Sequence, residues 1–460
     1  MARTSADASQ LPRPALLTSV GLLARIIPLS AISPVLAAEG KESQRERALP
    51  APFLVYLIVA LSLYMPYSLR EVLRCVLEGL RALDGQLTIA TKGAISRART
   101  RLGWQAMAGI FQQVARPIAT PETPGAWYRQ WRLMILDGTS LALQHTAENA
   151  AAFGLPDSKH GQGAFPLLRL VGLVEAGTRA VVAAAFAGWT THEISLAEQL
   201  LPALKPGMLL IEDRGFVGYG WWRRVSATGA DILCRVRKNM LFPGQKRLPD
   251  GSSLSVLRPP KGDPGEPIPV RVIEYTLKGV RGAEPFYRVI TSILDPEAAP
   301  APELAALYHE RWETETLFDE FKTHLRGGSR VLLRSKTPDL VRQEVYGLLL
   351  AHYSVRVVMH DAARAAGEDP DRISFLHTVR VLKRKLPQAA GVFPPSEADG
   401  LVPVGHRRSI WRNGSCPVGA AASRAGYGNA SANIEPANGG RQTWLRVSTI
   451  KRPWLSYESK

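Results

Sequence analysis

Two aspartates that follow apolar runs are the first residues of this sequence with a chemical interpretation. Asp137 follows Leu-Met-Ile-Leu, and Asp213 follows Met-Leu-Leu-Ile-Glu. Both runs are typical of buried strands, so each aspartate is expected at a strand end, where an Asp most often caps the following turn. Because strand side chains alternate, Glu212 and Asp213 must point to opposite faces. Parity groups Asp213 with Leu209 and Ile211, without saying which face would carry a site.

A third carboxylate lies in the charged stretch that runs from Tyr308 to Lys322. On a regular α-helix, four polar residues of this stretch share one sector of about 60°. They are Tyr308, Arg311, Glu315 and Lys322. An i,i+4 surface ion pair would explain Arg311 and Glu315, but not the tyrosine. An adjacent apolar stripe that could seat the helix on a sheet consists of Leu307, Phe318, Phe321 and Leu325. The remaining acids are interpreted as surface charges; they are Glu310, Glu313, Asp319 and Glu320.

Three carboxylates from two strand ends and a helix would suit two divalent cations. Hard oxygen ligands favour Mg²⁺ or Mn²⁺ over zinc. Two such ions stabilise the attacking and leaving oxygens of a phosphoryl transfer. The chain carries a net charge of +17 over 460 residues. That excess is expected to attract a polyanion, with nucleic acid the commonest partner and an anionic membrane the rival.

Cysteine usage and hydropathy narrow the class of protein further. Cys75, Cys234 and Cys416 are far apart and match no zinc or disulfide spacing, which fits a reducing cytoplasm. The apolar run of residues 53–65 is shorter than the roughly 20 residues of a spanning helix, so it predicts a buried core helix. A second apolar run, residues 16–40, imitates a signal peptide but is interrupted by Arg25 and Pro28.

The periodicity of the chain predicts several regions of different character. Residues 1–115 are expected to be helical, residues 126–235 and 301–365 to form an α/β unit, and residues 236–300 to be a β-rich insertion. Residues 366–400 are expected to be helical. Residues 401–460 are basic and rich in Gly, Ala, Ser and Asn, a composition typical of a disordered tail.

A basic segment near the end of the helical region indicates a DNA contact. Thr91 or Lys92 is expected to open a turn and Ser96 to cap a short helix. That helix would carry Arg97, Arg99 and Arg101. A helix, a turn with glycine and a basic helix suggest a helix-turn-helix-like unit. An ordinary solvated basic helix explains the segment equally well.

Together these residues resemble the insertion sequence 4 family of bacterial DDE transposases. The hallmark of that family is Tyr-x2-Arg-x3-Glu-x6-Lys, which the four residues of the 308–322 stretch match without departure. The segment Leu-Asp-Gly-Thr-Ser-Leu around Asp137 is similar to the first acidic motif, and residues 211–239 are similar to the second. Residues 46–64 and 91–103 look like the N-terminal DNA-binding region.

The resemblance implies a fold and a metal site. The fold is α/β: an RNase H-like catalytic domain, with a mixed sheet flanked by helices, a β-rich insertion and a helical N-terminal DNA-binding domain. Asp137, Asp213 and Glu315 would be the catalytic residues and would bind two Mg²⁺ or Mn²⁺ ions. Tyr308, Arg311 and Lys322 would contact phosphates near the cut end, the last two as cations.

Further DNA contacts are expected around the second acidic motif and the insertion. Arg214, Arg237 and Lys238 are candidates for contacts to the DNA backbone. Some family members cut the second strand through a DNA hairpin with a flipped base stacked on an aromatic residue. Tyr287 and Phe286 are candidates for that role, although an ordinary strand core would explain them equally well.

The expected function is that of a DNA transposase. Water would attack a phosphodiester at the terminal inverted repeat, and the released 3′-OH would then attack target DNA. The partners are double-stranded DNA and, by the resemblance, a second copy in a homodimer that joins two element ends; no membrane is involved. The site of action would be the nucleoid in the bacterial cytoplasm. The alternatives are a metal-dependent nuclease without strand transfer, an inactive DNA-binding relic and, last, a membrane protein.

Overall fold

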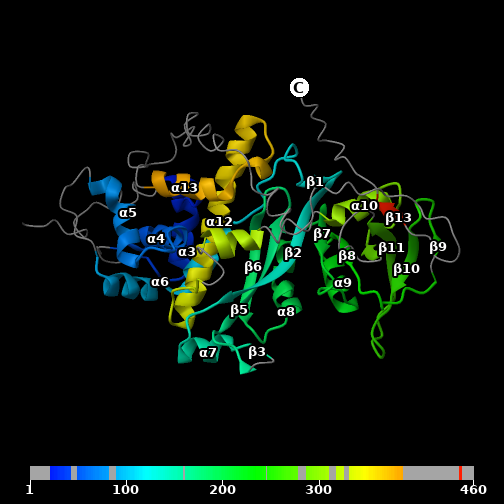
Figure 1. The fold of residues 1–460 in the computed structure, drawn as a ribbon, viewed down its shortest axis with the longest axis horizontal. Coiled ribbons are helices and arrows are strands. Elements are labelled where there is room, and N and C mark those ends of the chain that lie inside the picture. The colour runs from blue at the N-terminus through cyan, green and yellow to red at the C-terminus, as the bar shows by residue number, and fades with distance from the viewer. Residues whose placement is uncertain are drawn as a thin grey trace, which may run out of the picture.

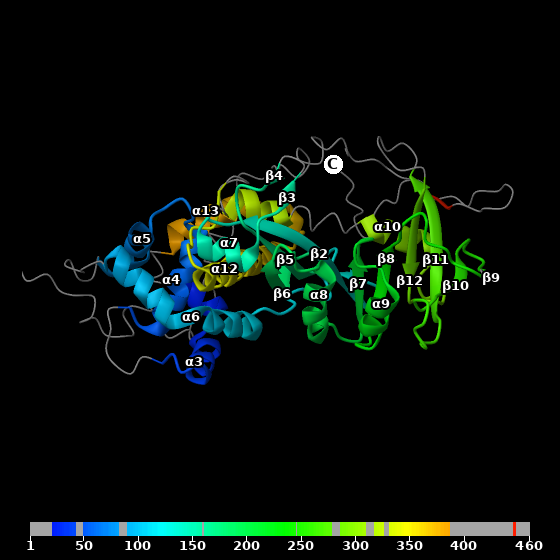
Figure 2. The ribbon, with the colours of Figure 1, turned by 90° about the horizontal axis from the view of Figure 1, so that it is seen from below.

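The computed structural model describes residues 21–42, 49–81, 90–158, 161–244, 246–277, 286–309, 317–325, 331–386 and 445–447. A cluster of N-terminal helices lies at one end of the molecule and the outer strands of a long sheet lie at the other (Figure 1). The long helix α12 (Pro338–Ala366) runs between the helices and the sheet, as the second view also shows (Figure 2).

The N-terminal helices form around one apolar helix. They are α2 (Gly21–Ile26), α3 (Leu29–Ala38), α4 (Ala51–Leu63), α5 (Leu69–Arg81) and α6 (Lys92–Val114). Every residue of α4 from Phe53 to Leu63 is buried, which confirms the predicted core helix. At Gly347 of α12 an added Cβ would lie 2.8 Å from a methyl group of Ile58, so glycine allows the two helices to approach closely. None of the helices in the described residues is long and apolar enough to cross a membrane.

The basic helix differs from its prediction. Thr91 is its N-cap and its hydroxyl accepts a hydrogen bond from the Ala94 N–H. The helix therefore starts before Gly93 and continues to Val114, with a kink at Gly103, where φ is 79°. The expected turn at Gly93 and cap at Ser96 are wrong, because the Thr91 hydroxyl already caps the helix by accepting from one of its first free N–H groups.

A mixed sheet of eleven strands in the described residues forms the body of the molecule. Its strands are β1 (Trp127–Tyr128), β2 (Trp131–Ala142), β5 (Leu167–Glu175), β6 (Ala180–Gly188), β7 (Met208–Glu212), β8 (Asp231–Arg235), β9 (Lys246–Arg247), β10 (Ser253–Leu257), β11 (Ile268–Leu277), β12 (Tyr287–Thr291) and β13 (Leu445–Val447). A separate short hairpin pairs β3 (Asp157–Ser158) with β4 (Gly161–Gln162).

The first five long strands have the order β6-β5-β2-β7-β8. Strands β2, β7 and β8 are parallel, and β5 and β6 pair antiparallel beside β2. This mixed sheet, flanked by helices, confirms the predicted RNase H-like α/β fold. Strands β12, β11, β10 and β9 follow antiparallel beyond β8, so the β-rich segment 236–300 continues the same sheet (Figure 1).

Helices cover both faces of the parallel strands. On one face lie α8 (Glu193–Ala197), η2 (Glu198–Ala203) and α9 (Tyr219–Ser226), packed on Met134, Leu136 and Leu210. On the other face α10 (Ala301–Tyr308) packs on a second set of strand residues: Leu133, Ile135, Leu209, Ile211 and Leu233. Alternation along each strand thus buries both faces, as parallel strands require.

The C-terminal part of the described chain packs on α12. It contains η5 (Pro370–Arg372) and α13 (Phe375–Lys385), and α7 (Ala147–Phe153) also contacts α12. Of the predicted disordered tail, Leu445–Val447 is described and pairs in parallel with Tyr275–Leu277 of β11. The rest of that prediction lies outside the described residues.

Candidate active site

Asp137 and Asp213 are brought together by the register of two parallel strands. The last pair between β2 and β7 is Leu136 with Glu212, and each aspartate is the next residue of its own strand path. Neighbouring strands lie about 4.8 Å apart, so the two aspartates are neighbours at this edge. Asp137 is not at a strand end as predicted: β2 continues to Ala142, because β5 remains paired with it after β7 has ended.

Strand alternation puts both aspartates on the face that α10 covers. Asp137 shares the parity of Ile135, and Asp213 shares that of Ile211, both of which pack against this helix. The sequence left this face undetermined. The structure thus places the two acids on the side of the sheet from which the Tyr308–Lys322 stretch begins.

The side chain of Glu212 points to the opposite face of the sheet from Asp213 and is buried in the interior. Its side chain is fully buried, and its Oε2 accepts a hydrogen bond from Nε1 of Trp221 in α9 at 2.8 Å. Burial raises the pKa of Glu212 to about 8, against the lowering effect of the Trp221 hydrogen bond. The carboxyl is therefore mainly protonated at neutral pH, and a neutral acid is a poor cation ligand. Of the two adjacent acids, Asp213 is the one suited to hold a metal.

Backbone hydrogen bonds orient both aspartates. The Gly138 N–H donates to Asp137 Oδ1 at 2.8 Å, and the Gly215 N–H donates to Asp213 Oδ1 at 2.7 Å. Both side chains are half-buried. Turn capping and a role in chemistry are therefore compatible, because one oxygen that accepts from the backbone leaves the second oxygen of each carboxylate outside this bond.

A further carboxylate, Glu193, lies next to this pair. An added Cβ on Gly138 would lie 2.9 Å from Glu193 Oε1, so the first residue of α8 reaches the strand beside Asp137. Burial raises the pKa of Glu193, Arg169 opposes the rise, and Asp213 and Asp137 add to it. Sequence reasoning missed this residue, because a glutamate at a helix start carries no signal of what it faces.

The charged stretch departs from a single regular helix. Helix α10 ends at Tyr308, and residues Glu320–Leu325 form a π-helix, η4. The predicted common sector assumed 3.6 residues per turn, which a π-turn with i→i+5 bonds does not keep. Arg311 and Glu315 lie outside the described residues. Lys322 is half-buried within η4.

Two polar side chains of the stretch are buried, which contradicts the surface position expected for Glu320. Tyr308 is 5% exposed and packs among apolar residues of the sheet rather than lying on the surface, and its predicted phosphate contact stays a prediction. Glu320, predicted to be a surface charge, is 3% exposed. All four residues of the predicted apolar stripe are buried, but Leu307 packs in the cluster around α10, whereas Phe318, Phe321 and Leu325 pack in the cluster that includes α12.

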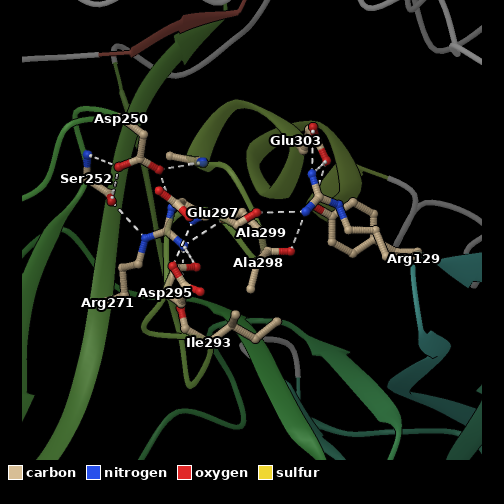
Figure 3. A network of polar contacts seen from close by, with 12 residues as sticks. Arg129, Asp250, Ser252, Arg271, Ile293, Asp295, Glu297, Ala298, Ala299 and Glu303 are labelled. Atoms are coloured by element: carbon tan, nitrogen blue, oxygen red, sulfur yellow. Dashed lines mark hydrogen bonds and ion pairs between the residues drawn. The ribbon is translucent and has the colours of Figure 1, made fainter.

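Helix α10 is anchored at its start by a buried ion pair from the outer strands (Figure 3). Asp250 forms an ion pair with Arg271 of β11 and accepts a hydrogen bond from the Ala301 N–H at 2.8 Å. Arg271, fully buried, also donates to the carbonyl oxygen of Ala299 at 2.7 Å. Pro300 is the N-cap residue of α10 and has no side chain that caps the helix. Asp250, which is distant in the sequence, therefore accepts a hydrogen bond from one of the free N–H groups of α10.

The cations predicted to contact DNA divide into exposed and buried ones. Arg214, Arg237 and Lys238 are exposed beyond the ends of β7 and β8, and Arg97 and Arg101 are exposed on α6. Arg99 is 4% exposed; its Nε donates to Gln343 Oε1 at 2.9 Å and its Nη2 to Ser335 Oγ at 3.1 Å. The guanidinium of Arg99 thus joins α6 to α12, and its predicted contact to DNA stays a prediction.

Tyr287 lies in an aromatic cluster at the start of β12. Its ring stacks on Tyr275 with centroids 5.4 Å apart, and the guanidinium of Arg235 lies 4.7 Å from its centroid. The ring of His309 meets it edge-on at 5.8 Å. Tyr287 is half-buried, so it combines packing within the sheet with partial access to solvent.

The donor chemistry at the sheet edge fits a hard divalent cation. Asp137 and Asp213 supply carboxylate oxygens, the ligands that Mg²⁺ and Mn²⁺ prefer. Among the described residues, no group of three or more His, Cys, Asp or Glu side chains is arranged to hold a metal ion. The predicted third ligand, Glu315, is outside those residues.

Comparisons with known proteins show the family to which the chain belongs. Residues 17–112 match the family model for the insertion element 4 transposase N-terminal region, and residues 130–353 match that for the transposase DDE domain. The chain is 30% identical over 373 residues to transposase InsG for insertion sequence element IS4 of Escherichia coli (strain K12), covering 79% of this chain and 82% of that protein.

Two further likenesses are more distant. Putative transposase y4zB of Sinorhizobium fredii (strain NBRC 101917 / NGR234) is 29% identical over 165 residues, which cover 34% of this chain and 44% of that one. The cryo-EM structure of the piggyBac transposase synaptic complex with hairpin DNA aligns with a TM-score of 0.44 and 14% identity, covering 87% of this chain and 85% of that one. The matched family models and the identity with transposase InsG show that this chain belongs to the insertion sequence 4 family of DDE transposases.

Proposed function

We propose that this transposase binds the terminal inverted repeats of its insertion sequence, hydrolyses phosphodiester bonds at the element ends and transfers the 3′-OH to target DNA. The observation that carries the proposal is the placement of Asp137 and Asp213 side by side, on the face of the sheet covered by the helix that leads into the Tyr308–Lys322 stretch. Family membership supports the same chemistry.

Asp137, Asp213 and Glu315 are the proposed ligands of two divalent cations, Mg²⁺ or Mn²⁺. When bound, two such ions activate a nucleophile and stabilise the leaving oxygen of an in-line displacement at phosphorus. The backbone N–H groups of Gly138 and Gly215 fix the orientation of the two aspartates. Because hydrolysis and strand transfer are both displacements at phosphorus, one arrangement of ligands serves both.

The exposed cations are the proposed contacts to DNA. Arg214, Arg237 and Lys238 continue from the edge that holds the aspartates, since β7 and β8 are parallel and end there. Arg311 and Lys322 are proposed to bind phosphates near the cut. Tyr287 is the proposed stacking partner of a displaced base, with Arg235 beneath its ring.

In this proposal, each region of the chain has a separate role. Residues 1–115 would bind the inverted repeats, with Arg97 and Arg101 of α6 among the contacts. Residues 126–235 and 301–365 would carry catalysis, residues 236–300 would hold the cut end, and residues 366–400 and 401–460 would form the C-terminal region. Two copies would hold the two element ends together, on DNA of the bacterial nucleoid.

The experiment that tests the proposal uses the full chain, DNA of the flanking element ends and Mg²⁺. Mapping of the cut should find a free 3′-OH at the element end. A second substrate, with the end already cut, should be joined to target DNA. Cleavage without joining would favour a metal-dependent nuclease, and end binding without cleavage would favour an inactive relic.

A further inference from the structure

A short cationic loop follows β8 at the edge of the sheet that holds the two aspartates. The last pair between β7 and β8 is Glu212 with Cys234, and β8 ends one residue later. The loop, residues 236–244, therefore begins one strand away from Asp213. The sequence from 235 to 249 contains five lysines and arginines and no acid. This charge suits the loop to a polyanion that lies across the same edge.

Leu241, in this loop, is the most exposed large apolar side chain in the part of the chain that the structure describes. It is 88% exposed, whereas the next, Tyr67, is 49% exposed. A single exposed leucine needs no explanation by itself, because apolar atoms make up much of any protein surface. The surroundings of Leu241 are what distinguish it, since it lies in the cationic loop close to Arg237 and Lys238, which are also exposed.

The residues on both sides of Leu241 pack inward. Phe242 is buried and Met240 is half-buried, and both belong to the apolar cluster under α9. Nη1 of Arg288 donates to the carbonyl oxygen of Met240 at 2.9 Å. Because both neighbours are held by the core, the loop presents Leu241 outward from a fixed backbone.

Strands of the β-rich insertion hold the loop in place. Arg288 of β12 donates from Nε to Glu274 of β11 at 2.6 Å, and its guanidinium lies 5.8 Å from the ring centroid of Phe242. Ser255 of β10 donates from Oγ to the carbonyl oxygen of Pro243 at 2.8 Å. A side chain on an anchored loop loses little freedom when it is pressed against a partner, so binding through it has a low entropic cost.

The charge around Leu241 favours DNA over a protein as the partner. Protein interfaces are depleted of lysine, whereas an apolar side chain among cations is typical of proteins that unstack DNA. In those proteins the cations hold phosphates while a leucine or a similar side chain enters between two base steps. Strands lie about 4.8 Å apart and successive bases about 3.4 Å apart. The loop therefore begins within about two base pairs of a phosphate held at the aspartates.

We propose that Leu241 is a wedge that enters the duplex of an element end beside the cut and separates two stacked base pairs. Arg237 and Lys238 hold the neighbouring phosphates, and the anchored loop keeps the leucine directed into the stack. A base displaced in this way can reach Tyr287, because β12 pairs with β8. The wedge rests on the proposed transposase function, in which the end of the element must be opened at the cut.

The test measures base stacking rather than cleavage. Element-end duplexes carry 2-aminopurine, whose fluorescence rises when it leaves the stack, at successive positions next to the cut, and divalent metal is omitted so that the DNA stays intact. Binding of the full chain should raise the fluorescence about threefold or more at one of these positions. Leu241→Ala should lose most of this rise, and Leu241→Met should keep it. A full rise with Leu241→Ala, or no rise with the bound unchanged chain, would overturn the wedge.

Leu294→Ala is the matched control. Leu294 is also an exposed leucine, but it follows β12 at the opposite edge of the sheet, because β12 runs antiparallel to β8. Neither alanine variant should shift the thermal unfolding midpoint by more than about 2 °C, since both side chains lie on the surface. Leu294→Ala should give the full fluorescence rise. A loss equal to that of Leu241→Ala would contradict the assignment.

A second measurement uses element ends whose base pairs at the cut are mismatched and therefore already open. Leu241→Ala should bind the paired end about tenfold more weakly than the unchanged chain and the mismatched end within about twofold, because no stack remains to be opened. Equal losses on both duplexes would overturn the wedge. A loss of self-association with a full fluorescence rise would also overturn it, since Leu241 would then contact a second copy.

The wedge and the proposed function fail on different results. If the unchanged chain does not bind element ends in preference to other DNA, both fail. If the unchanged chain binds and cuts the ends and Leu241→Ala gives the same fluorescence rise, only the wedge fails.

Discussion

Carboxylates in two regions of the molecule have opposite surroundings: backbone donors in one region and cationic side chains in the other. At the edge of the parallel strands, Asp137 and Asp213 are half-buried and accept hydrogen bonds from backbone N–H groups. Beside α12, Glu320 is buried and surrounded by two arginines and a histidine. Backbone donors orient a carboxylate without cancelling its charge, whereas cations cancel it. The first arrangement suits a ligand for a cation, and the second suits an anchor.

Glu212 sharpens this comparison, because it is adjacent to Asp213 and belongs to neither group. It is buried, no cation pairs with it in the part of the chain that the structure describes, and burial raises its pKa to about 8. A carboxyl group in this fold can thus be half-buried and oriented by backbone N–H groups, paired with cations, or neutralised by a proton. Position in the fold selects among these states, although the residue types are nearly the same.

The largest expected effect separates the two adjacent acids. Asp213→Asn should lower the rate of cleavage of an element end by about a thousandfold or more, because a proposed metal ligand is lost. Glu212→Gln should change it by less than about threefold, since Gln resembles the neutral acid already present. Rates of end cleavage at saturating Mg²⁺ measure both. Equal losses would remove the distinction between the strand faces.

The next effect is the pH dependence that Glu212 confers on stability. Its pKa is about 8 in the folded chain, against 4.5 for an ordinary glutamate. The folded state therefore holds the proton more tightly, and the contribution is complete below about pH 4.5 and lost as the pH rises through 8. The difference corresponds to about 5 kcal/mol at most.

Denaturant unfolding between pH 5 and 8 is the measurement for Glu212. Glu212→Gln should flatten the decline that the unchanged chain shows over this range. A variant with the same slope as the unchanged chain would mean that Glu212 does not carry the proton.

Glu320 should show the opposite slope. Burial favours its neutral form, but Arg356, His352 and Arg179 together hold the pKa of Glu320 at about 2. Its contribution to stability is therefore present above about pH 4.5 and is lost as the pH falls toward 2, by about 3 kcal/mol. Acid unfolding of Glu320→Gln should be less steep than that of the unchanged chain. An identical acid transition would show that the network does not stabilise the ionised carboxylate.

The smallest expected effect concerns the exposed cations near the site. Arg237→Ala and Lys238→Ala should each weaken DNA binding modestly and lower the slope of log affinity against log salt by about one. Both residues are exposed, whereas Arg99 is buried and hydrogen-bonded, so its replacement should instead destabilise the packing of α6 on α12. Salt titrations by fluorescence anisotropy, paired with unfolding midpoints, distinguish the two kinds of arginine. Loss of stability in Arg237→Ala would contradict this division.

Much of the fold was predictable because it follows from local patterns. The strand before Asp213, the hairpin of β5 and β6 and the buried helix α4 each have an apolar run with clear turn residues at its ends. The end of β2 was not predictable, because pairing with β5 extends this strand beyond the residue where the apolar run stops. The N-cap of α6 was not predictable either, because Thr91 and Ser96 can both cap a helix. The structure shows that Thr91 accepts the hydrogen bond from the Ala94 N–H.

The sequence by itself determined the family and its candidate chemistry, because residue types and spacing carry that information directly. Strand alternation also required Glu212 and Asp213 to face opposite ways. Only the tertiary structure decided which face carries Asp137 and Asp213, since this depends on where α10 packs. Only the tertiary structure showed that Tyr308, Arg99 and Glu320 are interior residues, because burial of a polar side chain is set by partners that lie far away along the chain.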